Sequence, residues 1–109
     1  MRLFTVLALA VVMAVSQRAH AANLFGSLWL DGRPVQGAQI EVTCSDRHQA
    51  QTDNNGSYSI FIPEKGRCVF QVVFAGHSGR TEVASYDNPI KYDFDLIRQN
   101  DGNYVLRSK

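Results

Sequence analysis

Cys44 and Cys68, the only two cysteines among 109 residues, carry the clearest chemistry in this sequence. In an oxidising compartment, an even number of cysteines favours a disulfide. This pair would close a loop of about 24 residues, for which the loop-entropy model gives about 3–3.5 kcal/mol of stabilisation. Two buried free thiols are the alternative. A metal site is disfavoured because no further thiol exists to complete a cage.

Two histidines, His48 and His77, are the other reactive side chains beyond residue 21. His48 has carboxylates nearby in the sequence, at Glu41 and Asp46, and such a pair can act as a general base. No motif marks a serine or cysteine nucleophile beside either histidine. We therefore interpret both as exposed loop histidines and expect no catalytic residue. A small secreted hydrolase with a non-standard site near His48 or His77 is the alternative function.

Asp53, Asn55 and Ser57 lie at alternate positions and could offer oxygen ligands to a calcium ion. However, Gly56 comes two positions too early for a twelve-residue calcium loop, and the terminal bidentate glutamate is missing. The Asn55-Gly56 pair instead favours a tight hairpin turn, because both residues tolerate the left-handed conformations that such a turn needs. We expect no metal and no cofactor.

Phe25, Trp29 and Tyr86 are the candidate partner-binding residues. Phe25 and Trp29 alternate out of phase with the core positions Leu28 and Leu30. Either they pack against a second layer, such as the C-terminal strand, or they form an exposed aromatic patch. Local packing is the preferred interpretation for this pair. Tyr86 begins a second candidate contact loop, residues 86–89.

The first 21 residues predict a cleaved signal peptide. Arg2 gives a positive start, residues 3–15 are almost wholly apolar, and small residues follow at Ala19 and Ala21. We expect cleavage after Ala21, one domain over residues 22–109, and a secreted or periplasmic location. The apolar run is too short to span a bilayer, which needs about 20 residues, so no membrane insertion is expected after cleavage.

The charge of the predicted mature chain is close to neutral. Without Arg2 and Arg18, the eleven Lys and Arg residues fall to nine, against ten Asp and Glu. No basic stripe is present, so we expect no nucleic-acid partner. The expected partner is another envelope or extracellular protein, and the sequence leaves the oligomeric state open.

Short alternating apolar runs predict an all-β fold. Turn residues separate these runs at intervals of roughly eight to twelve positions, which is typical of a sandwich or barrel. The predicted strands cover residues 24–30, 38–44, 48–52, 58–62, 68–74, 80–85, 92–96 and 104–107. We expect an Ig-like or transthyretin-like antiparallel sandwich of two sheets and about seven strands. The polar strand 80–85 is expected at an exposed edge, where it could pair with another chain.

The two cysteines support this arrangement. Cys44 ends one predicted strand, Cys68 begins another, and both fall on the inward set of positions. In an antiparallel pair, the end of one strand lies beside the start of its neighbour. We therefore expect the two strands to pair or to pack together.

Two motifs resemble those of carboxypeptidase regulatory-like domains. The first runs Gly26-x-Leu28-x-Leu30-Asp31-Gly32-x-Pro34-Val35-x-Gly37-Ala38-x-Ile40-x-Val42, and the second runs Thr52-Asp53-x-x-Gly56-x-Tyr58-x-Ile60. The resemblance implies a transthyretin-like sandwich that serves as a folding aid, spacer or binding module beside other domains. We expect the domain to stand alone here, which leaves its role open.

Transthyretin-like hydrolases that act on 5-hydroxyisourate carry a histidine in the first strand and end in Tyr-Arg-Gly-Ser. Residues 24–30 contain no histidine, and the sequence ends in Arg107-Ser108-Lys109. We therefore expect a non-catalytic binding or structural module, stabilised by one disulfide.

Overall fold

Strands follow the alternating apolar runs throughout residues 22–109, the part of the chain that this computed structural model describes. The predicted signal peptide, residues 1–21, lies outside the described residues. The strands are β1 (Leu24–Leu30), β2 (Arg33–Pro34), β3 (Gln39–Thr43), β4 (Arg47–Gln51), β5 (Ser57–Ile60), β6 (Gly66–Phe74), β7 (His77–Ser85), β8 (Ile90–Lys91), β9 (Phe94–Arg98) and β10 (Tyr104–Ser108).

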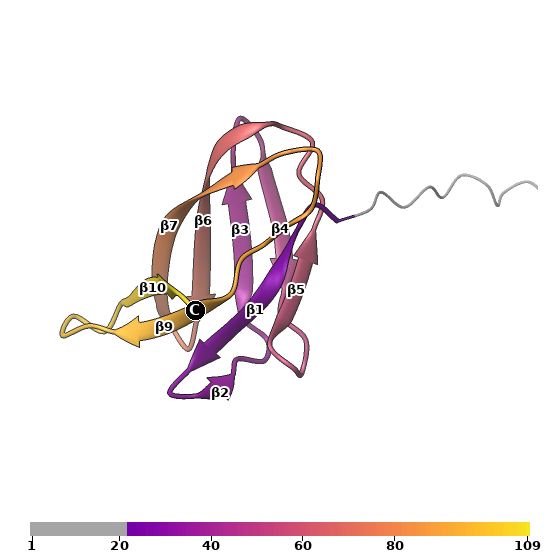
Figure 1. Cartoon of the computed structure of the whole chain (residues 1–109). Coiled ribbons are helices and arrows are strands. Elements are labelled where there is room, and N and C mark those ends of the chain that lie inside the picture. Colours follow the sequence, from indigo (N-terminus) through magenta and orange to yellow (C-terminus); the bar gives the residue numbers. More distant parts are fainter. Residues whose placement is uncertain (1–21) are drawn as a thin grey trace, which may run out of the picture.

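The strands form two sheets, and the prediction of an all-β sandwich is confirmed (Figure 1). One sheet has the order β4-β3-β6-β7 and is antiparallel throughout. The other has the order β10-β9-β1-β2, and β5 and β8 also pair with β1. β1 runs parallel to β8 and β9, which is the exception to the antiparallel pairing. This exception arises because the chain, after leaving β7, re-enters the second sheet at the end where β1 begins.

Side chains from both sheets meet in one apolar core. The largest fully buried apolar side chains are those of Phe70, Leu24, Leu28, Ile40, Ile62, Leu96, Val42 and Val72. The ring centroid of Phe70 on β6 lies 5.3 Å from that of Tyr58 and 5.1 Å from that of Phe94. Since β5 and β9 belong to the other sheet, these ring contacts join the two layers.

The segment between β4 and β5 does not form the tight hairpin predicted from Asn55-Gly56. β4 pairs with β3, whereas β5 pairs with β1, so this segment carries the chain from one sheet to the other. The side chain of Asp53 does hold a turn here, because its Oδ1 accepts the N–H groups of Asn55 and Ser57. Turn chemistry specifies such a bend, but it does not decide which strand the outgoing chain joins.

Gly26 lets the segment between β8 and β9 approach β1. A Cβ atom at Gly26 would lie 1.8 Å from the carbonyl oxygen of Tyr92. The hydroxyl of Tyr58 donates to this same oxygen at 2.7 Å. Any side chain at Gly26 would therefore push β1 away from the backbone at Tyr92 and disturb the hydrogen bond of Tyr58 to that backbone.

Asn23 is a buried polar residue, 4% exposed, that joins the start of β1 to two other segments. Its Nδ2 donates to the carbonyl oxygens of Ile62 and Tyr86 and to the hydroxyl of Ser85. Its Oδ1 accepts the N–H of Ile62 at 2.7 Å. The two N–H groups of the amide are shared among three acceptors and its oxygen accepts one donor, so both ends of the side chain are hydrogen-bonded, which offsets the cost of burying it.

Candidate functional site

A recess of about 860 Å³ lies where the outer face of β1 and β5 meets the edge of β4. Alternation along β1 turns Phe25, Ser27 and Trp29 away from the core and toward this recess. The other lining residues come from β1, β4, β5, the loop between β4 and β5, and the segment around β8: Gly26, Gln49, Ala50, Gln51, Asp53, Asn55, Ser57, Tyr58, Ser59, Lys91 and Asp93.

Phe25 and Trp29, two of the three candidate partner-binding residues, lie together in this recess. Phe25 is 36% exposed and offers an accessible aromatic face. Tyr86, the third candidate, is 54% exposed but does not line the recess. The loop containing Tyr86 is tied to the start of β1 through its backbone carbonyl, which accepts a hydrogen bond from Asn23.

The half-buried ring of Trp29 is held in place by polar contacts. Its Nε1–H donates to the hydroxyl of Ser27 at 2.8 Å, and that hydroxyl donates to Asp93 Oδ1 at 2.9 Å. The ammonium of Lys91 lies 3.6 Å from the other oxygen of Asp93. The ammonium of Lys109, just after the C-terminal strand, lies over the Trp29 ring at 5.0 Å from its centroid. Ser27 and Lys109 therefore contact the Trp29 ring directly. The ring of Phe25 is the more exposed of the two.

The polar lining of the recess was missed by the sequence reasoning. Gln49 and Gln51 occupy outward positions of β4, and Ser57 and Ser59 occupy outward positions of β5. Their alternation with buried neighbours was visible in the sequence, but their proximity depends on the crossing between sheets, which was not predicted. Carboxamides and hydroxyls around aromatic rings can donate and accept hydrogen bonds in several directions.

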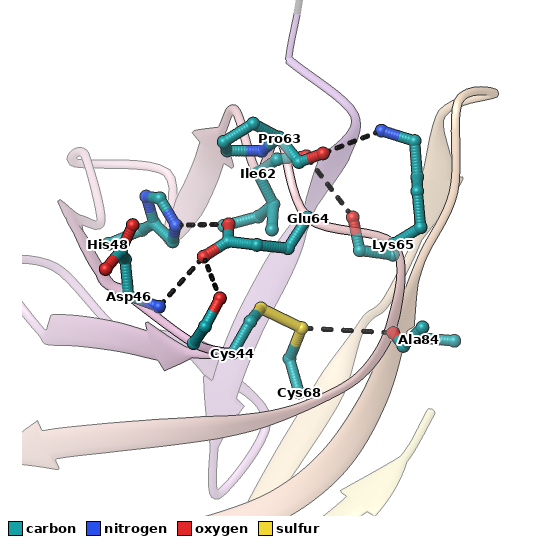
Figure 2. The surroundings of a disulfide bond; sticks show 12 residues. Cys44, Asp46, His48, Ile62, Pro63, Glu64, Lys65, Cys68 and Ala84 are labelled. Carbon is teal, nitrogen blue, oxygen red and sulfur yellow. Dashed lines mark hydrogen bonds and ion pairs between the residues drawn. A yellow bond between two sulfur atoms is a disulfide. The ribbon is translucent and has the colours of Figure 1, made fainter.

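The disulfide lies at one end of the sandwich and joins the two strands that were predicted to meet there (Figure 2). Cys44 and Cys68 are bonded, and their Cα atoms are 4.5 Å apart. The strands β3 and β6 that lead to them pair antiparallel, with Thr43 opposite Val69. The predicted disulfide and the predicted proximity of its strands are both confirmed.

Glu64 forms a second link at the same end of the molecule (Figure 2). Its Oε1 lies 2.7 Å from His48 Nε2 on β4, and its Oε2 accepts the backbone N–H of Asp46 at 2.9 Å. The hydroxyl of Ser45 also donates to Oε2, at 3.3 Å. The hydrogen bond from the Asp46 backbone is the largest cause that lowers the pKa of Glu64 from 4.5 to about 2, and the backbone N–H of Glu64 and the contact with His48 add to it.

The carboxylate that contacts His48 is therefore Glu64, and not Asp46 or Glu41, the two carboxylates that lie near it in the sequence. Glu41 instead pairs with Arg47, at 3.3 Å. The side chain of His48 is 19% exposed, so the expectation of an exposed loop histidine was wrong as well. This contact was not predicted, because Glu64 is 16 residues from His48 in the sequence. β5 and the loop that follows it bring Glu64 back beside β4.

His77 is also packed rather than free in a loop, because it is the first residue of β7. Its ring meets that of Tyr104 edge-on, with centroids 6.2 Å apart. A side chain added at Gly102 would begin 2.8 Å from the imidazole. Among the described residues, no hydroxyl or thiol makes a hydrogen bond to either imidazole.

Residues 22–109 contain no group of three or more His, Cys, Asp or Glu side chains placed to hold a metal ion. The same residues form no helix that is long and apolar enough to cross a membrane. Comparison with known proteins finds no matching protein-family model and no matching curated protein.

Proposed function

We propose that this protein is a non-catalytic binding module of the periplasm or extracellular space, and that the recess is where it contacts another envelope or extracellular protein. The observation that carries the proposal is the placement of Phe25 and Trp29 together in one polar recess. Aromatic side chains surrounded by hydrogen-bonding groups are typical of protein-recognition surfaces.

The charges of the recess suit a neutral protein segment. Lys91 forms an ion pair with Asp93, and the carboxylate of Asp53 accepts hydrogen bonds from the backbone of its own turn. No excess of positive charge is available to attract nucleic acid or an anionic membrane surface. An incoming partner would therefore be selected by aromatic contact and by hydrogen bonds to carboxamides and hydroxyls.

The disulfide supports an exported location. Such bonds persist in secreted and periplasmic proteins and are rare where glutathione keeps thiols reduced. Cys44 and Cys68 are joined here, and they are the only cysteines of the chain. We infer that the apolar segment before residue 22 acts as the export signal, and that the domain matures in an oxidising compartment.

We also infer a relationship to carboxypeptidase regulatory-like domains, for which binding or structural roles are the expectation. The support is the two-sheet architecture together with the two motifs that contain Gly32 and Asp53. A small hydrolase near His48 is the second candidate, and the observation in its favour is the imidazole–carboxylate contact of 2.7 Å. Since the Ser45 hydroxyl donates to Glu64 rather than to His48, a reacting nucleophile would have to come from elsewhere.

The test compares two phenylalanines of equal exposure. Phe25 is 36% exposed and lines the recess, whereas Phe61 is 37% exposed and lies outside it. Protein expressed from all 109 residues is immobilised with its disulfide intact and exposed to envelope extract of the source organism. We expect Phe25→Ala to reduce retention of a captured protein about tenfold or more, and Phe61→Ala to retain it. Equal retention by both variants would contradict the proposed face, and turnover of ester substrates that is lost in His48→Ala would favour the hydrolase.

A further inference from the structure

Strand β4 exposes an unpaired backbone edge. Thr52 N–H donates to Ala38 O, so these two residues form a hydrogen-bonded pair at the end of the β3–β4 ladder. Because such pairs alternate along an antiparallel ladder, Arg47, Gln49 and Gln51 direct their N–H and C=O groups away from β3. Within residues 22–109, no group bonds to these outward backbone atoms.

The opposite edge of the same sheet is largely covered, contrary to the expectation that it would be open. The N–H groups of Ser78 and Ala84 on β7 donate to Asn103 Oδ1 at 3.4 Å and to the Tyr92 hydroxyl at 2.9 Å. At Gly79, the backbone of β10 comes so close that a Cβ atom would lie 2.5 Å from a carbonyl oxygen. β7 is therefore the edge strand that was predicted, but β4 is the edge with room for another chain.

Nothing in β4 itself blocks pairing. Native edge strands are commonly protected by lysine, proline, a bulge or a covering segment. The sequence of β4, Arg47–Gln51, contains neither lysine nor proline, and its register with β3 has no bulge. Its one charged side chain, Arg47, is paired with Glu41 at 3.3 Å. The recess borders this strand at Gln49 and Gln51, which leaves space between the edge of β4 and the outer face of β5.

We propose that the protein forms a two-fold dimer in which β4 pairs antiparallel with β4 of a second copy. With the two-fold axis at Gln49, this residue faces Gln49 of the second copy and Arg47 faces Gln51. Each of these pairs would exchange both N–H···O bonds, because their backbone groups point outward in both copies. The two four-stranded sheets would then continue as one sheet across the dimer.

The side chains of β4 suit a second copy of the same strand. In this register no like charges face each other: two glutamines meet at the axis, and each Arg47 meets a glutamine. On the inward side, His48 faces Ala50, which is small. Isologous two-fold dimers are the commonest assemblies of identical chains. A domain near this size buries only about 60–65% of its unfolded surface, so further burial would add stability.

This inference goes beyond the proposed function and does not depend on it. The dimer uses the backbone of β4, whereas the aromatic contacts of partner recognition are assigned to Phe25 and Trp29 on β1. Since the two-fold axis runs perpendicular to the shared sheet, the recesses of both copies would adjoin the junction.

The test is sedimentation velocity on purified protein from the full-length sequence, from micromolar to millimolar concentrations. Gln49→Pro removes only the outward N–H and leaves the bonds of β4 to β3 intact. Gln49→Lys places two positive charges against each other at the axis. The matched control is Arg80→Pro, which removes an outward N–H from β7. Amide exchange by NMR provides a second measurement, in which Gln49 and Gln51 should gain protection as concentration rises.

We expect a monomer–dimer equilibrium in the wild type, with a dissociation constant raised roughly tenfold or more by each Gln49 variant and unchanged by Arg80→Pro. A wild type that remains monomeric at millimolar concentration would overturn the proposal. The proposal would also be overturned if the dimer survives in Gln49→Lys and the amides of Gln49 and Gln51 gain no protection in the wild type. If Gln49→Pro fails to fold, Gln49→Lys and the exchange data decide. If the dimer is absent but Phe25-dependent partner capture persists, only this inference fails.

Discussion

The Nε2 atom of His48 lies 2.7 Å from Oε1 of Glu64, and this contact ties β4 to the loop that leads from β5 to β6. The disulfide between Cys44 and Cys68 lies at the same end of the sandwich (Figure 2). One covalent and one hydrogen-bonded link thus secure neighbouring segments. They are expected to respond to different conditions, because one is broken by reduction and the other by acid.

Acid should weaken the Glu64 link in a defined range. Its pKa is lowered to about 2 in the folded protein from 4.5, so the carboxylate binds a proton more readily when the chain is unfolded. The stability that this provides is complete above pH 4.5 and is lost as the pH falls toward 2. In urea titrations across this range, the unfolding midpoint should fall more for the wild type than for Glu64→Gln. Parallel curves for the two proteins would contradict this account.

Loss of the disulfide should cost more than loss of any single surface contact. Replacing Cys44 and Cys68 together with alanine, or reducing the bond, should lower the free energy of unfolding by about 3 kcal/mol, since the unfolded chain is no longer constrained. Urea denaturation of oxidised protein, reduced protein and the double variant measures this effect. The reduced wild type and the double variant should agree within about 1 kcal/mol, and a loss below about 1 kcal/mol would show that the cross-link contributes little.

Asn23 should be far more important than its position beside the predicted cleavage point suggests. Asn23→Ala removes four hydrogen bonds and leaves the buried N–H of Ile62 without its partner. We expect a loss of about 2–4 kcal/mol in the free energy of unfolding. Thermal unfolding of Asn23→Ala should therefore show a clear fall in Tm, while replacement of the exposed Asn54 by alanine should leave it nearly unchanged. Equal Tm values for the two variants would contradict the role assigned to Asn23.

The sequence predicted those parts of the fold that depend on local alternation. Tyr58, Ile60 and Ile62 face the core, as their spacing indicated, and Phe70 and Val72 do so on β6. The disulfide followed from the same alternation together with the number of cysteines. The sheet to which each strand belongs was harder to predict from the sequence, because the turn after β4 is compatible with a hairpin and also with a crossing to the other sheet. Only the packing of the whole chain selects between them.

The same limit applies to the candidate site. Phe25 and Trp29 were recognised because their spacing put them out of phase with the core of one strand. Gln49 and Ser59 were not, since exposed polar residues are common and their meeting depends on the placement of β4 beside β5. His48 and Glu64 are 16 positions apart in the sequence, and no local sequence pattern predicts their contact.

A methyl group at Gly26 should be far more costly than one at Gly32. At Gly26 a Cβ atom would lie 1.8 Å from Tyr92 O, whereas at Gly32 no atom lies within 4 Å. The positive φ of 78° at Gly32 still makes alanine unfavourable there, by about 1 kcal/mol. We expect Gly26→Ala to lose about 3 kcal/mol or more, because the backbone must move to relieve the overlap. Urea denaturation of the two variants provides the comparison, and similar losses would contradict the close approach.

The contact of Lys109 with Trp29 can be tested by fluorescence, because Trp29 is the only tryptophan in the protein. The Lys109 ammonium lies 5.0 Å from the centre of the indole ring. Lys109→Ala should expose one face of the ring, shift its emission to longer wavelength and increase quenching by acrylamide. The cost in stability should be only about 0.5–1 kcal/mol, since the pair is near the surface. Lys65→Ala is the matched control, because Lys65 pairs with Asp87 and does not line the recess; unchanged emission in Lys109→Ala would show that the lysine does not cover the ring.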